Sequence, residues 1–322
     1  MKNVPLGRTG ISVSELCFGT MSFGGDADEA TSAQLYAACR NAGINFFDCA
    51  DVYGLGAAET ILGKLMAHER DELVVTSKVQ GKMGKDENSG GTNRRHVARA
   101  VEASLKRLNT DRIDVYFVHQ FDHATPLEET LRGLEDIVRA GKVIYIGASN
   151  YAAWQVAKAL GISAKESWAR FDVLQPMYNL VKRQAETEIL PLAISEGLGV
   201  ISYSPVGGGL LSGKFRPGQK PDGTRLANNE MYAARYGEAW VYDVAEKFTV
   251  QADKMGVHPV SLAVAWVAGH QGITAPIIGA RNPEQLAPSL ASVEIDMTDL
   301  LRSEISALSR TPPPANDRLE EQ

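Results

Sequence analysis

The sequence lacks the features that mark several classes of protein. No uninterrupted apolar run approaches the roughly 20 residues of a membrane-spanning helix, and the N-terminus lacks the basic-then-apolar pattern of a signal peptide. With 33 Lys and Arg against 39 Asp and Glu, the net charge is −6, which argues against a nucleic-acid-binding surface. We therefore expect a cytoplasmic protein with neither a membrane nor a nucleic-acid partner.

Cysteine is also scarce. The three cysteines, Cys17, Cys39 and Cys49, cannot all pair and do not have the spacing of metal ligands. Each falls in or beside an apolar segment, so we expect buried, reduced thiols. His119 has no second ligand near it in sequence, and no serine lies in a nucleophile-elbow motif, so neither a metal site nor a serine nucleophile is predicted.

The sequence does contain a regular succession of apolar segments. Runs that resemble strands begin near Leu16, Ile44, Leu73, Ile113, Val143, Asp172, Gly199 and Ile273. Apart from one longer gap after Leu73, the first seven recur about every 30 residues, the length of a strand plus its crossover helix. An open doubly wound sheet and a closed (β/α)8 barrel both fit this alternation. Strand count and chain length favour the α/β class with a TIM barrel, and no GxGxxG motif follows the first strand.

The intervening segments have helical periodicity, notably 57–66 and 92–108. Another helix is predicted with Thr125 as its N-cap, Pro126 at the first position and Glu128 completing a capping box. Two long loops, 79–91 and 204–231, interrupt the pattern, and such loops are usually functional lids or disordered.

The ends of the chain complete the predicted architecture. A Gly-Arg-Thr-Gly turn between two short extended pieces predicts an N-terminal hairpin within residues 1–15, which could close one end of the barrel. Residues 296–322 are expected to form an amphipathic helix, with Leu300, Ile305 and Leu308, and then a tail along the surface. Because no linker divides the chain, we expect residues 1–322 to form a single barrel domain.

Polar residues close each of the first seven apolar runs. In a barrel, the C-terminal ends of the strands form one face, where the chemistry lies. Each residue alone has an ordinary structural explanation, such as a solvated strand end, but together on one face they indicate a functional site. They are Gly19-Thr20, Asp48 with Tyr53, Lys78, His119, Ser149-Asn150, Gln175 and Tyr203-Ser204.

Four of these residues suit proton transfer. A buried lysine paired with Asp48 would stay charged, and beside Tyr53 it would favour phenolate and lower a pKa that is ordinarily about 10. A tyrosine tuned in this way can give a proton to a carbonyl oxygen while hydride reaches the carbon. His119 can hydrogen-bond the same oxygen and orient the carbonyl. None of these side chains carries a hydride, so a cofactor must supply it.

The chain resembles the aldo-keto reductase superfamily over essentially its whole length. Asp48, Tyr53, Lys78 and His119 match the catalytic tetrad of that family in order and in strand placement. The run VEASLKRLNTDRIDVYFVH (101–119) is similar to the family as well. Several ordered motifs make this resemblance far more specific than one short pattern.

The resemblance implies NADP(H) as the cofactor, with NAD(H) as the alternative. GASN (147–150) matches the Ser-Asn pair that holds the nicotinamide carboxamide, with Gln175 as third partner, and YSPVGGGLLSGK (203–214) resembles the stacking tyrosine and the pyrophosphate loop. IIGARNPEQL (277–286) resembles the adenosine-end motif, where Arg281 would pair with the 2′-phosphate and Gln285 would reach the adenine. Ser289 stands where the family has an asparagine, which implies a weaker or water-mediated contact. The expected cofactor contacts are Gly19, Thr20, Met21, Asp48, Ser149, Asn150, Gln175, Tyr203, Ser204, Pro205, Val206, Gly209, Leu210, Lys214, Gly279, Ala280, Arg281, Gln285 and Ser289.

The function implied is the NADP(H)-dependent interconversion of aldehydes or ketones with alcohols. The substrate pocket is expected to consist of Phe23, Tyr53, His119, Phe121 and the two long loops. Some members of the superfamily are instead cofactor-sensing regulatory subunits of potassium channels with slow turnover. The intact tetrad is compatible with both functions. The absence of an extended segment before the hairpin favours the enzyme, and no particular oligomeric state is predicted.

Overall fold

A closed barrel of eight parallel strands forms the centre of the molecule. The computed structural model describes residues 1–215, 226, 229–318 and 320. The barrel strands are β3 (Cys17–Gly19), β4 (Phe46–Asp48), β5 (Val74–Val79), β6 (Ile113–Val118), β7 (Val143–Ser149), β8 (Phe171–Gln175), β9 (Gly199–Ser202) and β10 (Ala275–Ile278). They follow one another in chain order, and β10 closes the barrel by pairing with β3. Each begins within two residues of its predicted position, and the predicted (β/α)8 barrel is confirmed.

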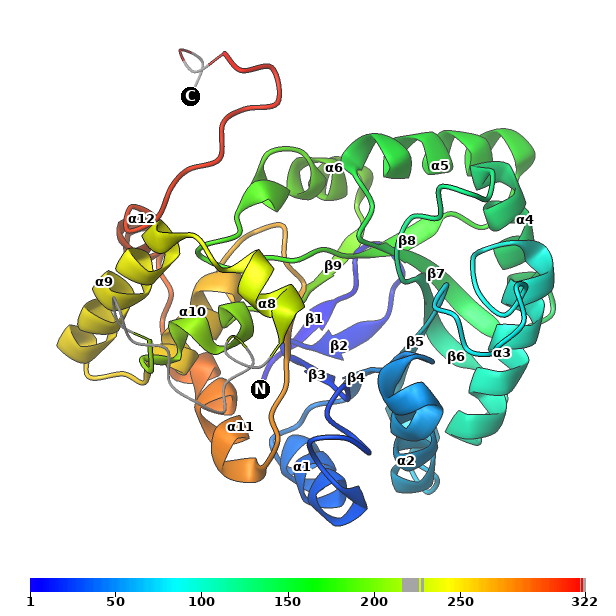
Figure 1. Ribbon diagram of the computed structural model, residues 1–322, viewed down its shortest axis with the longest axis horizontal. Helices are drawn as coiled ribbons and strands as arrows, with labels where there is room; N and C mark the ends of the chain where they lie inside the picture. Colours follow the sequence, from blue (N-terminus) through cyan, green and yellow to red (C-terminus); the bar gives the residue numbers. More distant parts are fainter. Residues whose placement is uncertain (216–225, 227–228, 319, 321–322) are drawn as a thin grey trace.

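Helices surround the barrel (Figure 1). They are α1 (Glu29–Asn41), α2 (Ala57–Leu65), α3 (Arg94–Leu108), α4 (Leu127–Arg139), α5 (Ala153–Glu166), α6 (Ile189–Glu196), α8 (Glu230–Arg235), α9 (Ala239–Met255), α10 (Pro259–Ala268), α11 (Pro283–Leu290) and α12 (Asp299–Ser306). Short 3-10 turns are η1 (Tyr53–Gly56), η2 (Arg70–Glu72), η3 (Gln184–Glu186), η4 (Gly207–Ser212) and η5 (Ala291–Glu294). Among the described residues, no helix combines the length and the apolar character needed to cross a membrane.

Helix α3 illustrates how the sequence specifies these elements. The Asn93 side chain caps its start by accepting a hydrogen bond from the backbone N–H of His96, and Asn109 ends it in the left-handed region with φ 50°. Val97 and Val101, one turn apart, are fully buried. The helix therefore packs one apolar face against the barrel, as its periodicity predicts.

Helix α4 begins differently from the prediction. Pro126, not Thr125, is the N-cap residue, and no side chain caps the helix. The Thr125 hydroxyl donates instead to the Asp122 carboxylate at 2.7 Å. The predicted capping box with Glu128 is therefore wrong, because a carboxylate of the preceding loop holds the hydroxyl that was expected to cap the helix.

The N-terminal hairpin closes one end of the barrel. Strands β1 (Asn3–Pro5) and β2 (Ser12–Ser14) pair antiparallel. The Tyr145 hydroxyl donates to the carbonyl of Thr9 at 2.9 Å, and the N–H of Arg8 donates to the carbonyl of Gly197 at 3.0 Å. The hairpin residues Leu6 and Val13 belong to an apolar cluster inside the barrel whose other buried members are Cys17, Phe46, Val74, Val115, Phe117, Val173, Ile201 and Ala275. Access to the barrel from this end is therefore blocked.

The three cysteines are buried and have free thiols, as predicted. Burial raises the pKa of each of these thiols well above its ordinary value. Because the thiolate is the reactive form, these groups are chemically inert at neutral pH.

The first long loop, predicted as a lid or as disorder, is folded. The N–H of Gly91 donates to the carbonyl of Gln80 at 2.8 Å, and the N–H of Met83 to that of Ser89 at 2.8 Å. Thr92 ties the end of this loop to Asp122 through its N–H at 2.9 Å and its hydroxyl at 3.2 Å. The second loop contains η4, but its residues 216–225 and 227–228 lie outside the described part of the chain, and so does much of the segment that was expected to be a lid or disordered.

The C-terminal helix packs less completely than predicted. In α12, Ile305 is fully buried, whereas Leu300 is 71% exposed. Arg183 holds the end of this helix by donating to the carbonyl of Ser306 at 3.2 Å. The tail contacts the surface as far as Pro313, whose carbonyl accepts from the Thr187 hydroxyl at 3.4 Å, and then runs away from the barrel (Figure 1).

Candidate active site

Four ionisable side chains meet at the C-terminal ends of β4, β5 and β6. Lys78 Nζ lies 2.8 Å from Oδ1 and 2.7 Å from Oδ2 of Asp48, and 3.3 Å from the hydroxyl of Tyr53. The rings of Tyr53 and His119 meet edge to face with centroids 6.1 Å apart. The structure thus brings together the four residues that the strand ends predicted.

Strand register explains why the carboxylate is so well held. Asp48 is the register partner of Thr76 on β5, and alternate residues of a strand share a face, so Thr76 and Lys78 both face Asp48. Thr76 Oγ1 donates to Asp48 Oδ1 at 2.7 Å, and Gln175 Nε2 donates to the same oxygen at 2.8 Å. Sequence reasoning missed Thr76, although its position two residues before Lys78 was the available signal.

A left-handed turn places Tyr53 over the end of its strand. After Tyr53, the backbone runs through Gly54 (φ 56°), Leu55 (φ 52°) and Gly56 (φ 95°). Glycine adopts this conformation readily, but leucine does so only with strain. The turn leaves the Leu55 side chain exposed beside the site.

Burial and neighbouring charges together set the protonation of the lysine and the tyrosine. Burial is the largest single influence on Lys78 and disfavours its ammonium, but the charges and hydrogen bonds of Asp48 and Tyr53 together raise the pKa of Lys78 above its ordinary value. Burial raises the pKa of Tyr53 to about 12, although the Lys78 cation acts to lower it. The lysine therefore acts in the predicted direction, but the net pKa lies above its ordinary value, because burial is the larger influence. Tyr53 is a protonated phenol at neutral pH.

His119 is a neutral imidazole at neutral pH. Burial, followed by the nearby Lys78 cation, lowers the pKa of His119 to about 4. Its backbone is fixed by two hydrogen bonds: its N–H donates to the carbonyl of Val79 at 2.9 Å, and its carbonyl accepts from Asn150 Nδ2 at 2.9 Å. A neutral ring held in this way can donate one hydrogen bond and accept another.

Amide and hydroxyl groups lie beside the tetrad. Ser149 Oγ donates to the carbonyl of Gln175 at 2.9 Å and accepts from Asn150 Nδ2 at 3.1 Å, while the Tyr203 hydroxyl donates to Asn150 Oδ1 at 2.7 Å. A nicotinamide carboxamide offers one acceptor oxygen and two N–H donors. Side-chain amides and hydroxyls carry both donors and acceptors, so these residues have the chemistry to bind such a group by exchanging their bonds with one another for bonds to it.

Of the predicted adenosine-end residues, Arg281 lies on the loop before α11, whereas Gln285 and Ser289 lie within the helix. Asn282 caps this helix by accepting from the N–H of Gln285 at 2.9 Å, and Gln285 Oε1 accepts from the N–H of Arg281 at 3.3 Å. Arg281 Nε lies 3.2 Å from Asp26 Oδ2, a pairing that sequence reasoning did not anticipate. Ser289 is buried on the inner face of α11.

The other predicted cofactor residues differ in exposure. The buried Thr20 hydroxyl donates to the carbonyl of Asp48 at 3.0 Å, and Leu210 is fully buried in η4. Met21 and Lys214 are exposed. The remaining residues are Gly19, Ser204, Pro205, Val206, Gly209, Gly279 and Ala280, of which Pro205 and Ala280 are buried.

The predicted substrate-pocket residues are not all accessible. Phe23 is fully buried and packs against Phe18 with ring centroids 5.8 Å apart, so a ligand could touch it only if neighbouring side chains moved. Phe121 is partly exposed and packs edge to face on Tyr151, with centroids 5.1 Å apart. Trp154, an exposed side chain that sequence reasoning missed, extends this aromatic group, with its centroid 6.3 Å from that of Phe121.

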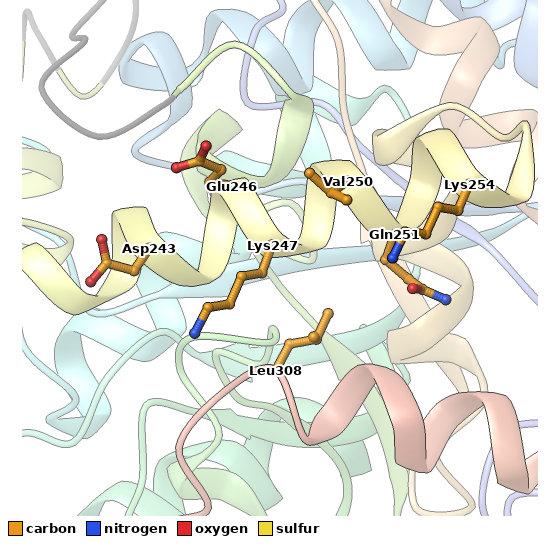
Figure 2. Close-up of a pocket in the computed structure, with 7 residues that line it drawn as sticks. All are labelled: Asp243, Glu246, Lys247, Val250, Gln251, Lys254 and Leu308. Carbon is orange, nitrogen blue, oxygen red and sulfur yellow. The ribbon is translucent and has the colours of Figure 1, made fainter.

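A separate groove lies on the flank of the molecule (Figure 2). It has a volume of about 570 Å³ and is lined by Asp243, Glu246, Lys247, Val250, Gln251 and Lys254 of α9 and by Leu308. It shares no residue with the tetrad, and its side chains are mostly charged and solvated. In the part of the chain that is described, no three acidic, histidine or cysteine side chains gather where they could hold a metal ion.

The sequence matches the Aldo/keto reductase family over residues 15–310. A relative described as an uncharacterized oxidoreductase, YrpG of Bacillus subtilis, is 39% identical over 309 residues, covering 92% of each chain. A probable voltage-gated potassium channel subunit beta of Arabidopsis thaliana is 35% identical, covering 90% of each chain. The versiconal hemiacetal acetate reductase of Aspergillus parasiticus is 31% identical, covering 92% of this chain and 94% of its own.

Proposed function

The chain belongs to the aldo/keto reductase family, and on that premise we propose that it is an NADP(H)-dependent oxidoreductase. It would reduce aldehydes or ketones to alcohols and catalyse the reverse reaction. The observation that carries the proposal is the contact between Lys78 and Tyr53, 3.3 Å from nitrogen to oxygen, next to the buried Asp48 carboxylate. When bound, a reduced nicotinamide supplies the hydride, which no side chain of the site can provide.

Tyr53 is the proposed general acid for carbonyl reduction and the general base for alcohol oxidation. Its high pKa keeps the phenol protonated and available to the carbonyl oxygen. As the proton leaves, the Lys78 ammonium stabilises the phenolate that forms. Asp48 keeps the lysine charged and fixed in place, so its own role is indirect.

His119 is proposed to orient the carbonyl. Its ring stands edge-on to Tyr53, and it is neutral, so it does not compete to lose a proton. It can therefore donate a hydrogen bond to the same oxygen that receives the proton from Tyr53. Phe121 and the exposed Trp154 offer apolar area at the edge of the site for the rest of the substrate.

The cofactor is proposed to lie across the C-terminal face of the barrel. Ser149, Asn150 and Gln175 would bind the carboxamide, and the Tyr203 ring would stack on the nicotinamide. At the other end, Arg281 would pair with the 2′-phosphate at the start of α11, where helix geometry also favours an anion.

The test is steady-state oxidation of NADPH with a panel of aldehydes and ketones. Tyr53→Phe is expected to lower turnover on the order of 10²- to 10⁴-fold, the usual contribution of a general acid. Its dissociation constant for NADPH should stay close to that of the wild type. Tyr116→Phe is the matched control, because Tyr116 is a buried barrel tyrosine outside the tetrad. A Tyr53→Phe variant that keeps more than half of wild-type turnover would contradict the assignment.

A second candidate function is a cofactor-sensing regulatory subunit. The similarity to proteins described as potassium channel beta subunits from Arabidopsis thaliana and rice favours it. In that case the same tetrad would turn over slowly and would report the redox state of the cofactor. Less than one NADPH oxidised per protein with every substrate of the panel would support this function over the enzyme.

A further inference from the structure

An acidic residue from the start of the chain faces the proposed phosphate-binding arginine. Asp26 Oδ2 lies 3.2 Å from Nε of Arg281, and the two side chains are 50% and 37% exposed. Asp26 belongs to the turn between β3 and α1, whereas Arg281 follows β10. Both segments leave the C-terminal ends of strands that pair with each other in the closed barrel.

The turn that carries Asp26 is fixed against the arginine loop. Ser22 Oγ donates to the carbonyl of Ala280 at 2.8 Å, so the two loops are joined one residue before Arg281. The N–H groups of Gly25 and Ala27, on either side of Asp26, both donate to the carbonyl of Ser22, at 3.1 and 2.9 Å. The backbone thus places the carboxylate beside Arg281.

A carboxylate in this position distinguishes the two dinucleotides. The 2′-phosphate of NADPH carries close to two negative charges near neutral pH, and NADH has a neutral hydroxyl at that position. A phosphate that binds Arg281 must either displace Asp26 or remain near its negative charge, and both reduce its affinity. A hydroxyl does neither, and it can itself donate a hydrogen bond to a carboxylate.

We propose that Asp26 is a specificity residue that competes with the 2′-phosphate for Arg281 and moves the cofactor preference toward NADH. This inference rests on the proposed function, in which Arg281 binds that phosphate. The pair is partly exposed, so removing the carboxylate should tighten NADPH binding by about three- to tenfold at low salt. Added salt should shrink the effect, because solvent ions screen exposed charges over about 10 Å at 0.1 M.

The experiment measures dissociation constants for NADPH and NADH from the quenching of protein fluorescence, which needs no turnover. Wild type, Asp26→Asn, Arg281→Ala and the double variant are compared. Asp26→Asn should tighten NADPH selectively, and this gain should vanish in the Arg281→Ala background. Arg281→Ala alone should weaken NADPH by about ten- to a hundredfold and leave NADH nearly unchanged.

Glu29→Gln is the matched control. Glu29 is an exposed carboxylate at the start of α1 that pairs with Lys64, so the variant removes one negative charge near the same turn without touching Arg281. Equal tightening by Glu29→Gln and Asp26→Asn would overturn the inference, because general charge would then explain the effect. A selective loss in Arg281→Ala combined with no change in Asp26→Asn overturns the role of Asp26 alone. Equal or no losses in Arg281→Ala overturn the proposed phosphate site as well.

Discussion

Lys78 and Asp48 form an ion pair that is closed off from water. The nitrogen lies 2.7 Å from Oδ2, and the side chains are 0% and 3% exposed. Removing one partner of such a pair leaves the other charge buried and uncompensated, typically at about 3–5 kcal/mol of stability. The pair is therefore expected to contribute to stability in addition to its proposed role in catalysis.

Lys78→Met is expected to change both stability and pH dependence. The free energy of unfolding in urea should fall by about 3–5 kcal/mol. The lysine lowers the pKa of Tyr53, so its loss raises that pKa further. The proposed alcohol oxidation needs the phenolate, so the pH at which its rate increases should be higher in the variant than in the wild type. The turnover number at a fixed pH should fall.

Two variants separate these effects. Lys64→Met removes an exposed lysine from a surface ion pair and should change neither property appreciably. Adding Asp48→Asn to Lys78→Met should recover part of the stability, because no unpaired charge then remains buried. An unchanged pH profile in Lys78→Met, with only a modest loss of rate, would show that Lys78 is structural.

Asp51 is expected to make the fold less stable as pH rises. It is 1% exposed, and within the described part of the chain neither carboxylate oxygen makes a hydrogen bond of ordinary geometry. Burial, and then the Glu59 carboxylate, raise the pKa of Asp51 to about 7. The folded state therefore holds a proton on Asp51 that the unfolded chain releases near pH 4. As the pH rises from about 4 to about 7, the free energy of unfolding should fall by on the order of 4 kcal/mol in total because of this group.

Asp51→Asn tests this expectation directly. The variant cannot ionise at this position, so its free energy of unfolding should decrease less between pH 5 and pH 8 than that of the wild type. Asp243→Asn, an exposed carboxylate on α9, serves as the control and should follow the wild-type curve. Parallel curves for Asp51→Asn and wild type would show that Asp51 ionises as easily in the folded protein as in the unfolded chain.

Gly147→Ala should destabilise the protein through overpacking. A Cβ at this position on β7 would lie 2.4 Å from the Phe117 ring and 2.7 Å from the carbonyl of Val173. Such overpacking usually costs about 1–3 kcal/mol. Gly161→Ala in α5 is the contrasting variant, because nothing lies within 4 Å of its added methyl group. It should stabilise the protein by about 0.8–1 kcal/mol, the difference in helix propensity. The free energy of unfolding of both variants is measured in urea. Equal changes in the two variants would contradict the close approach of β7 to Phe117.

Two features could be predicted because both follow from the order of apolar and polar residues along the chain: the barrel, and the meeting of Asp48, Tyr53, Lys78 and His119. Apolar runs end where strands end, and parallel strand ends share one face. Effects that depend on the surroundings of a side chain could not be predicted in this way. The net pKa of Tyr53 depends on how deeply it is buried, and the burial of Phe23 depends on its packing against Phe18.

Contacts between segments far apart in the sequence could not be predicted either. Asp26 and Arg281 lie near opposite ends of the chain, and only the closure of β10 on β3 brings them together. Thr125 was expected to cap α4, but Asp122, three residues before it, holds its hydroxyl. In both cases the side chain has more than one possible partner in the sequence, and the tertiary fold determines which partner it contacts.

The hairpin that closes the barrel also constrains the order of assembly. Arg8 and Thr9 precede every barrel strand in the chain, yet they bond to Gly197 and Tyr145, which follow much later. Contacts between such distant residues form slowly, because a long loop must be closed before they contribute. The hairpin is therefore expected to dock only after β7 and β9 have formed. Until then, Leu6 and Val13, which finish in the apolar cluster inside the barrel, would be exposed to water, and transiently exposed apolar surface of this kind favours aggregation.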